Sequence, residues 1–92
     1  MIKAIDHPDG LEVLSCGIKR YWKDGRLHRL DGPAYENVTG YKAWYINGER
    51  SRFDGPAQEY VSGTGDWYVG GVRINCETNE QFLRLMKLKA FL

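Results

Sequence analysis

The fold is decided by residues 41–57, which read YKAWYINGERSRFDGPA. An aromatic-rich run, typical of a half-buried strand, leads into Asn47-Gly48. That dipeptide tolerates positive φ at both central positions of a type I′ hairpin turn. Asp54-Gly55-Pro56 marks a second turn, since aspartate closes turns with its side chain and proline fixes φ as a new strand begins. The stretch therefore predicts a strand, a tight turn, a short strand and a passage into the next hairpin.

The same pattern recurs every 23 residues along the chain. Gly25, Gly48 and Gly71 keep this step, and it carries the segment 31–34 (DGPA) onto 54–57. Aromatic positions keep it as well, in the two series Tyr21, Trp44, Trp67 and Trp22, Tyr45, Tyr68. Further turns are expected at 38–40 and 61–63. We therefore predict a mostly β fold of tandem 23-residue β-hairpin repeats over residues 9–76, arranged as an antiparallel meander.

The repeat gives way near Ile74 to a helical pattern. Thr78 and Gln81 have the spacing of a capping box, and a broad apolar stripe begins at Phe82. We predict one C-terminal α-helix over residues 78–91, within a single domain that spans residues 1–92. Its apolar face can serve either as a cap on the last repeat or as a subunit interface, and the sequence leaves both open.

The charge and the cysteine content limit the kinds of partner and the cellular compartment that we expect. Lys plus Arg number 13 against 12 Asp plus Glu, so no long nucleic acid is expected, whereas a small anion with one or two phosphates is compatible. Cys16 and Cys76 lack metal or redox spacing and suggest a reducing compartment. No apolar run is long enough for a membrane span. We expect a cytoplasmic protein with no cofactor, no metal and no membrane partner.

Groups for catalysis are sparse, so we expect that the protein is not an enzyme. The chain has two histidines, and most of its acids occupy turn positions or alternate with apolar residues. No phosphate loop, metal-binding helix or nucleophile elbow is present. A pairing of Cys16 with His28 is the nucleophilic arrangement that the sequence leaves open.

Binding is better supported than catalysis. Nine aromatic side chains follow the expected strands, with arginines close by in the sequence. Flat rings stack on bases and guanidinium groups grip phosphates, a combination that suits a nucleotide. For Tyr21, Trp44 and Trp67 a role in the core is the stronger interpretation, because periodic apolar residues are usually core.

The repeat also separates scaffold from candidate ligand contacts. Positions that change between units are freer to serve a ligand, as in the series His28, Ser51, Ile74 and Leu27, Arg50, Arg73. The pairs Arg29–Asp31 and Arg52–Asp54 either tie a loop together or leave the arginine for a phosphate. The candidate ligand-binding residues are Trp22, His28, Arg29, Tyr45, Arg50, Arg52, Tyr68 and Arg73.

Two family resemblances arise at these residues. Residues 22–29, WKDGRLHR, are similar to the tryptophan, glycine and histidine pattern of MORN repeats, although 29–34 (RLDGPA) departs from their glycine-rich step. The longer string, HRxDGPA, resembles small repeat proteins of tailed phages and some large viruses. It is intact in the first unit, and Ser51 replaces the histidine in the second.

Among small phage proteins, the chain resembles the anti-CBASS and anti-Thoeris nucleotide sponges. That resemblance implies a viral immune-evasion protein that sequesters a cyclic dinucleotide or a cyclic ADP-ribose signal in the host cytoplasm. It also implies no cleavage of the ligand and assembly as a homo-oligomer. The candidate residues above come from the repeat pattern rather than from this resemblance. The alternative is a MORN-like repeat module that binds a host or virion protein.

Overall fold

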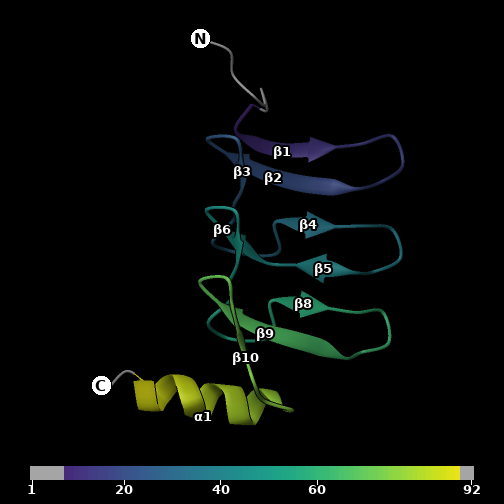
Figure 1. Ribbon diagram of the computed structural model, residues 1–92. Helices are drawn as coiled ribbons and strands as arrows, with labels where there is room; N and C mark the ends of the chain where they lie inside the picture. The colour runs from purple at the N-terminus through teal and green to yellow at the C-terminus, as the bar shows by residue number, and fades with distance from the viewer. Residues whose placement is uncertain (1–7, 90–92) are drawn as a thin grey trace.

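The chain forms stacked β-hairpin units followed by a helix that lies across one end of the stack (Figure 1). The computed structural model describes residues 8–89. The first unit contains β1 (Gly10–Val13), β2 (Lys19–Lys23) and β3 (Arg26–Leu27). The second contains β4 (Tyr35–Glu36), β5 (Lys42–Ala43), β6 (Tyr45–Ile46) and β7 (Glu49–Arg50). The third contains β8 (Gln58–Glu59), β9 (Gly65–Val69) and β10 (Val72–Ile74), and the helix is α1 (Asn79–Lys89).

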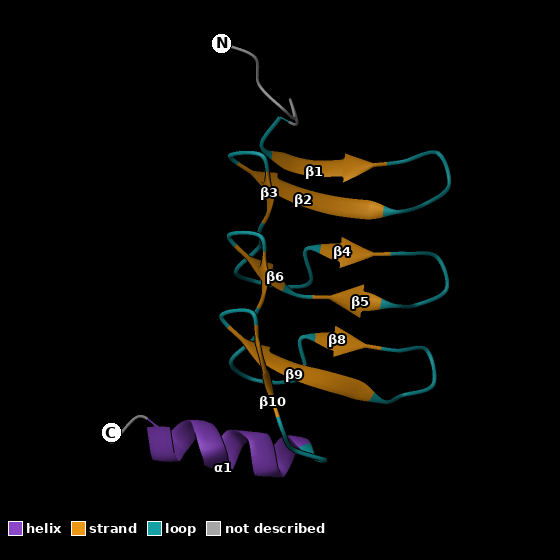
Figure 2. Ribbon diagram, in the orientation of Figure 1, coloured by secondary structure: helices purple, strands orange, loops and turns teal. Residues whose placement is uncertain are grey.

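The strands pair antiparallel throughout, in the order β1-β2-β4-β5-β8-β9-β10, with β3 added to β2 and with β6 and β7 forming a separate ribbon. Figure 2 shows the strands of successive units stacked one below the other. The protein is a slab with extents of 43 × 33 × 18 Å. The prediction of a mostly β, antiparallel fold with one C-terminal helix is therefore confirmed.

The tight turns have the backbone that their sequences predict. Asp24 and Asn47 take φ values of 50° and 51°, and the glycine that follows each is also positive, at 75° and 82°. Gly70 and Gly71 repeat the pattern at 57° and 81°. Two consecutive positive φ values are the signature of a type I′ turn, whose twist matches that of the flanking strands.

Equivalent backbone hydrogen bonds connect each unit to the next. The Tyr21 N–H donates to the Ala34 carbonyl, and 23 residues later the Trp44 N–H donates to the Ala57 carbonyl, both at 2.8 Å. Ala34, Ala43 and Ala57 are fully or almost fully buried where the units meet. Small side chains let the turns approach the sheet closely, so the scaffold repeats and the units differ in the side chains they display.

The helix begins as its capping signal predicts. The Gln81 N–H donates to Thr78 Oγ1 at 3.1 Å, and Gln81 Oε1 accepts from the Glu77 N–H at 2.8 Å. Phe82 is fully buried and packs on Trp67, with ring centroids 6.4 Å apart. The helix thus caps the third unit. Its first residue is Asn79 rather than 78, and residues 90 and 91 of the predicted helix lie outside the described range.

Within residues 8–89, no helix combines the length and the apolar character needed to cross a membrane.

Candidate functional site

Strand alternation divides the aromatic side chains between two faces of the sheet. Neighbouring residues on a strand point to opposite faces, so Tyr21 and Trp22 on β2 separate, as do Trp67 and Tyr68 on β9. We call the face that carries Trp22, Tyr45 and Tyr68 the tyrosine face. The opposite face, which carries Tyr21, Trp44 and Trp67, is called the clamp face after the arginines that cover it.

On the clamp face, Arg29 ties its own loop together. Its Nε donates to Asp31 Oδ1 at 2.9 Å, its Nη1 donates to the Pro33 carbonyl at 3.1 Å, and its guanidinium lies 4.0 Å from the centre of the Tyr21 ring. A Cβ on Gly32 would lie 2.8 Å from the Arg29 Cζ, which explains the glycine in the DGPA segment. The hydrogen bond and the charge of Arg29 lower the pKa of Asp31.

Arg52 repeats this clamp 23 residues later. Its bonds to Asp54 and to the Pro56 carbonyl have the same lengths, 2.9 and 3.1 Å, and its guanidinium lies 3.9 Å from the Trp44 ring centre. Arg52 also donates to Glu59 Oε2 at 2.9 Å. Both predicted phosphate contacts, Arg29 and Arg52, are thus held in loop-tying bonds. Half-buried Tyr21 and Trp44 pack under guanidinium groups rather than in an apolar core.

Because the two clamps are alike, we expect truncation of either arginine to destabilise the protein by a similar amount. Arg29→Ala and Arg52→Ala should each lower the free energy of unfolding by about 1–2 kcal/mol, because each removes an ion pair, a bond to a carbonyl and a cation–π contact. Arg52→Ala should cost more by a few tenths, since it also loses Glu59. Urea denaturation measures both. Arg26→Ala, an exposed control, should change stability by less than about 0.5 kcal/mol. Two clamp variants as stable as that control would contradict this interpretation.

His28 connects two units through one of its ring nitrogens. Its Nδ1 accepts from the Asn47 N–H at 2.9 Å, and at the next repeat position the Ser51 Oγ accepts from the Gly70 N–H at 3.0 Å. Ser51 is only 4% exposed. The Ser51 side chain therefore turns inward and binds the following tight turn, so in these two units this repeat position connects one unit to the next.

The tyrosine face brings four predicted site residues together. The Arg50 guanidinium lies between two tyrosine rings, 5.9 Å from the centre of Tyr45 and 5.6 Å from that of Tyr68. Its Nε is buried without a hydrogen-bond partner. Burial alone would lower the pKa of Arg50, but its interactions with Tyr45 and the other neighbouring tyrosines outweigh burial, so that pKa is raised. Arg73 stands opposite Tyr68 in the ladder and completes the group.

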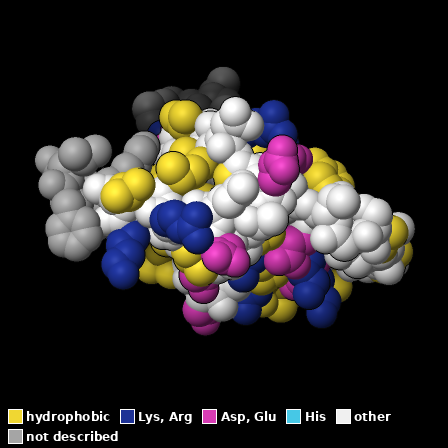
Figure 3. Space-filling view, turned by 90° about the horizontal axis from the view of Figure 1, so that it is seen from below, with side chains coloured by type: hydrophobic (Ala, Val, Ile, Leu, Met, Phe, Trp, Pro, Cys, Tyr) yellow, Lys and Arg dark blue, Asp and Glu magenta, His cyan; other side chains and the backbone are white. Residues whose placement is uncertain are grey.

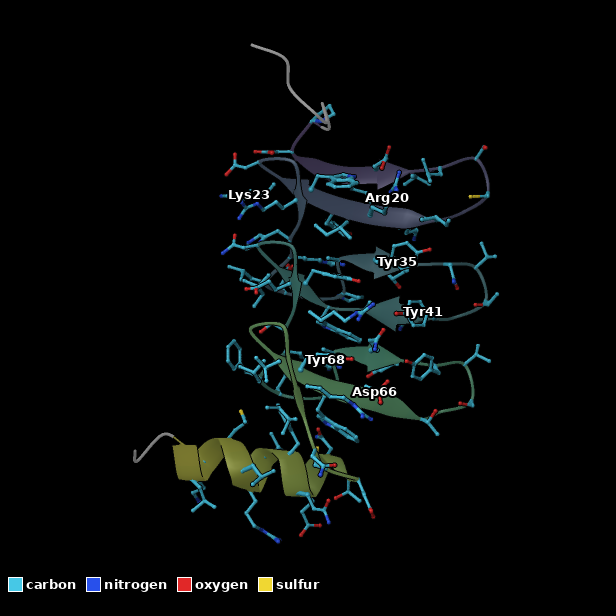
Figure 4. All side chains as sticks on the ribbon, in the orientation of Figure 1. Arg20, Lys23, Tyr35, Tyr41, Asp66 and Tyr68 are labelled. Carbon is cyan, nitrogen blue, oxygen red and sulfur yellow. The ribbon has the colours of Figure 1, made fainter. Side chains whose placement is uncertain are left out.

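A row of tyrosine rings continues this face toward the hairpin tips. Tyr35 and Tyr41 meet edge to face with centroids 5.9 Å apart, and Tyr41 lies 5.6 Å from Tyr60. The Tyr41 hydroxyl donates to Gln58 Oε1 at 2.7 Å. Burial raises the pKa of Tyr41, so this hydroxyl stays protonated as the donor. Figure 4 shows Arg20, Tyr35, Tyr41, Tyr68 and Asp66 following the stack along its length.

Asp66 lies at the end of the tyrosine row, and both oxygens of its carboxylate accept hydrogen bonds. It accepts from the Tyr60 hydroxyl at 2.8 Å, from Gln58 Nε2 at 3.4 Å and from Arg73 Nη2 at 3.2 Å. The hydrogen bond to Asp66 raises the pKa of Tyr60. The charge of Arg73 is therefore balanced by a carboxylate, in contrast to that of Arg50.

Trp22 stands one unit away, in a cluster of its own. Its Nε1 donates to Glu12 Oε1 at 2.9 Å, and Arg20 binds the same oxygen while its guanidinium lies 5.3 Å from the centre of the Trp22 ring. The predicted site thus falls into four places. Tyr45, Arg50, Tyr68 and Arg73 form one group, Trp22 lies farther along the same face, Arg29 and Arg52 occupy the opposite face, and His28 lies between units.

Comparison with known proteins adds no relative. No protein-family model matches the chain, and neither the curated proteins nor the solved structures yield a significant match. Among residues 8–89, no group of three or more His, Cys, Asp or Glu side chains is placed to hold a metal ion.

Proposed function

We propose that this protein binds a small cyclic nucleotide on its tyrosine face and sequesters it without cleaving it. The observation that carries the proposal is Arg50, a cation flanked by two tyrosine rings that forms no ion pair within the described residues. Most other described arginines are paired with a carboxylate, namely Arg20, Arg29, Arg52, Arg73 and Arg84.

A nucleotide fits both the unpaired cation and the tyrosine rings of this site. Its phosphate oxygens can supply the acidic partner that Arg50 does not have among the described residues, because a guanidinium binds phosphate with charge-assisted hydrogen bonds. A base can stack on a partly exposed tyrosine ring of this face, and stacking contributes about 1–3 kcal/mol per base. A cyclic dinucleotide or a cyclic ADP-ribose isomer offers a base and phosphate groups within one small ligand.

Sequestration without cleavage is favoured by the state of the acidic groups. Asp66 and Glu12, the acids of this face, are bound by arginines and by other donors, so neither is presented as a free general base. The resemblance to phage nucleotide sponges supports the same reading. It extends the proposal to a viral protein that acts as a homo-oligomer in the host cytoplasm against an immune signal.

Thermal melting against a panel of cyclic dinucleotides and cyclic ADP-ribose isomers tests this proposal. A ligand present at a thousandfold excess over its dissociation constant should stabilise the fold by about 4 kcal/mol. The ligand should then be recovered unchanged after heat denaturation, as judged by liquid chromatography and mass spectrometry. A linear or hydrolysed product would indicate an enzyme. No shift with any member of the panel would favour the alternative, a repeat module that docks a protein.

A further inference from the structure

A groove on the clamp face is lined by apolar side chains that nothing covers in the single chain. It encloses about 480 Å³ between the loops of the two arginine clamps, above Trp44 and Ile46. Leu30 and Phe53, which occupy the same repeat position, line it and are 79% and 61% exposed. We call this feature the clamp groove.

The most exposed charged groups on the rim of the clamp groove are acidic. The side chains of Asp31 and Asp54 are 87% and 84% exposed, and each is bound to one arginine through Oδ1. The side chains of Arg29 and Arg52 are only 24% and 21% exposed. The exposed charge beside the groove is therefore carried by the two aspartates, so an apolar partner with a positive surface suits the groove.

The outer surface of α1 has the complementary character. Leu83 and Leu88 are 45% and 60% exposed. Successive residues of an α-helix are rotated by about 100° around its axis, so Leu83 and Leu88 lie on either side of Arg84 and Lys87. Both of these cations are exposed. Viewed from below the stack, hydrophobic, basic and acidic side chains are intermixed on this side of the molecule (Figure 3). Glu80 neutralises one of the two cations, which leaves a net positive, leucine-flanked surface.

We infer that α1 of one copy docks in the clamp groove of a second copy, in a head-to-tail arrangement. Helix-to-helix pairing would gather two copies of Arg84 and Lys87, and groove-to-groove pairing would gather four exposed aspartates. Helix-to-groove docking instead joins apolar to apolar surface and positive to negative charge. In a single chain α1 packs on Trp67 below the third unit, while the groove is formed by loops of the first two units. Such a contact repeats, and it gives a ring or a filament.

Two variants remove one surface each and leave the clamps intact. The groove variant is Leu30→Lys with Phe53→Lys, and the helix variant is Lys87→Glu with Leu88→Glu. All four side chains are exposed, so the fold should persist, which circular dichroism and melting verify. The matched control is Val38→Lys with Val61→Lys, at hairpin-tip positions that are 75% and 71% exposed.

Sedimentation velocity measures the outcome without any nucleotide. Wild type and control should sediment as species of at least twice the monomer mass, and each surface variant should sediment as a monomer. The helix variant, labelled at exposed Cys16, is then titrated with unlabelled groove variant. The mixture contains one intact groove and one intact helix, so the labelled mass should double, whereas titration with more helix variant should leave it unchanged.

Several results would overturn the inference. A wild type that is monomeric at all concentrations would exclude the contact. Variants that stay oligomeric would place the interface elsewhere. A mixture that stays monomeric while the wild type is oligomeric would indicate a symmetric interface. None of these outcomes bears on nucleotide binding, which the melting panel tests separately.

Discussion

Phe82→Ala should lower the free energy of unfolding by about 3–5 kcal/mol, as expected when a fully buried phenylalanine leaves a cavity. Phe82 has no exposed surface and is the largest fully buried side chain of the described residues. It packs on Trp67, where the first two units instead have Arg29 on Tyr21 and Arg52 on Trp44. The substitution therefore uncovers the last ring of the stack. Urea denaturation followed by tryptophan fluorescence measures the loss.

Leu83→Ala is the matched control for this prediction. Leu83 is the next residue on the same helix, but it is 45% exposed and should cost less than about 1 kcal/mol. A loss of under 1 kcal/mol for Phe82→Ala would show that α1 contributes little to the cap. The third unit would then have to be stable without it.

Local signals in the sequence were sufficient for the fold class. The tight turns depend on dipeptides such as Asn47-Gly48, and the helix start depends on Thr78 and Gln81, which are three positions apart within one turn. The packing of the periodic aromatics was harder to foresee. Tyr21 and Trp44 were expected in the core, yet each is half-buried beneath an arginine eight residues later in the chain. That contact exists only after the chain has turned back over the sheet, so alternation and hydrophobicity do not reveal it.

The candidate site was predictable in part, for a related reason. Arg50 and Arg73 were selected because their repeat position changes between units, and both lie on the tyrosine face. The same criterion applied to strand positions would have found Tyr41, which replaces Ile18 of the first unit, and Asp66, which replaces Arg20. The repeat position of His28 also changes between units, but there the change accompanies a contact between units. The His28 side chain accepts a hydrogen bond from the Asn47 N–H, which belongs to the following unit. A change between units can therefore mark a connection as well as a ligand contact.

Arg50→Ala should weaken binding of the nucleotide that gives the largest melting shift by about 1.5–3 kcal/mol, roughly 10- to 160-fold in Kd. The reason is that the phosphate then loses a cation held between two rings, whose charge no acid among the described residues balances. Arg50→Lys keeps the charge but loses the planar fork, so it should fall between wild type and Arg50→Ala. Isothermal titration calorimetry measures all three, and melting without ligand corrects for any loss of folded protein.

Arg73→Ala is the control that separates a specific contact from net charge. Arg73 occupies the equivalent repeat position, one unit later, and removing it changes the charge of the protein by the same amount. Its guanidinium is already bound to Asp66 at 3.2 Å and is largely exposed, so its loss should change Kd by no more than about fivefold, or 1 kcal/mol. Equal losses from Arg50→Ala and Arg73→Ala would mean that binding follows the overall charge of the face. A Kd within a factor of two of wild type for Arg50→Ala would exclude Arg50 as the phosphate contact, even if the nucleotide still stabilises the fold.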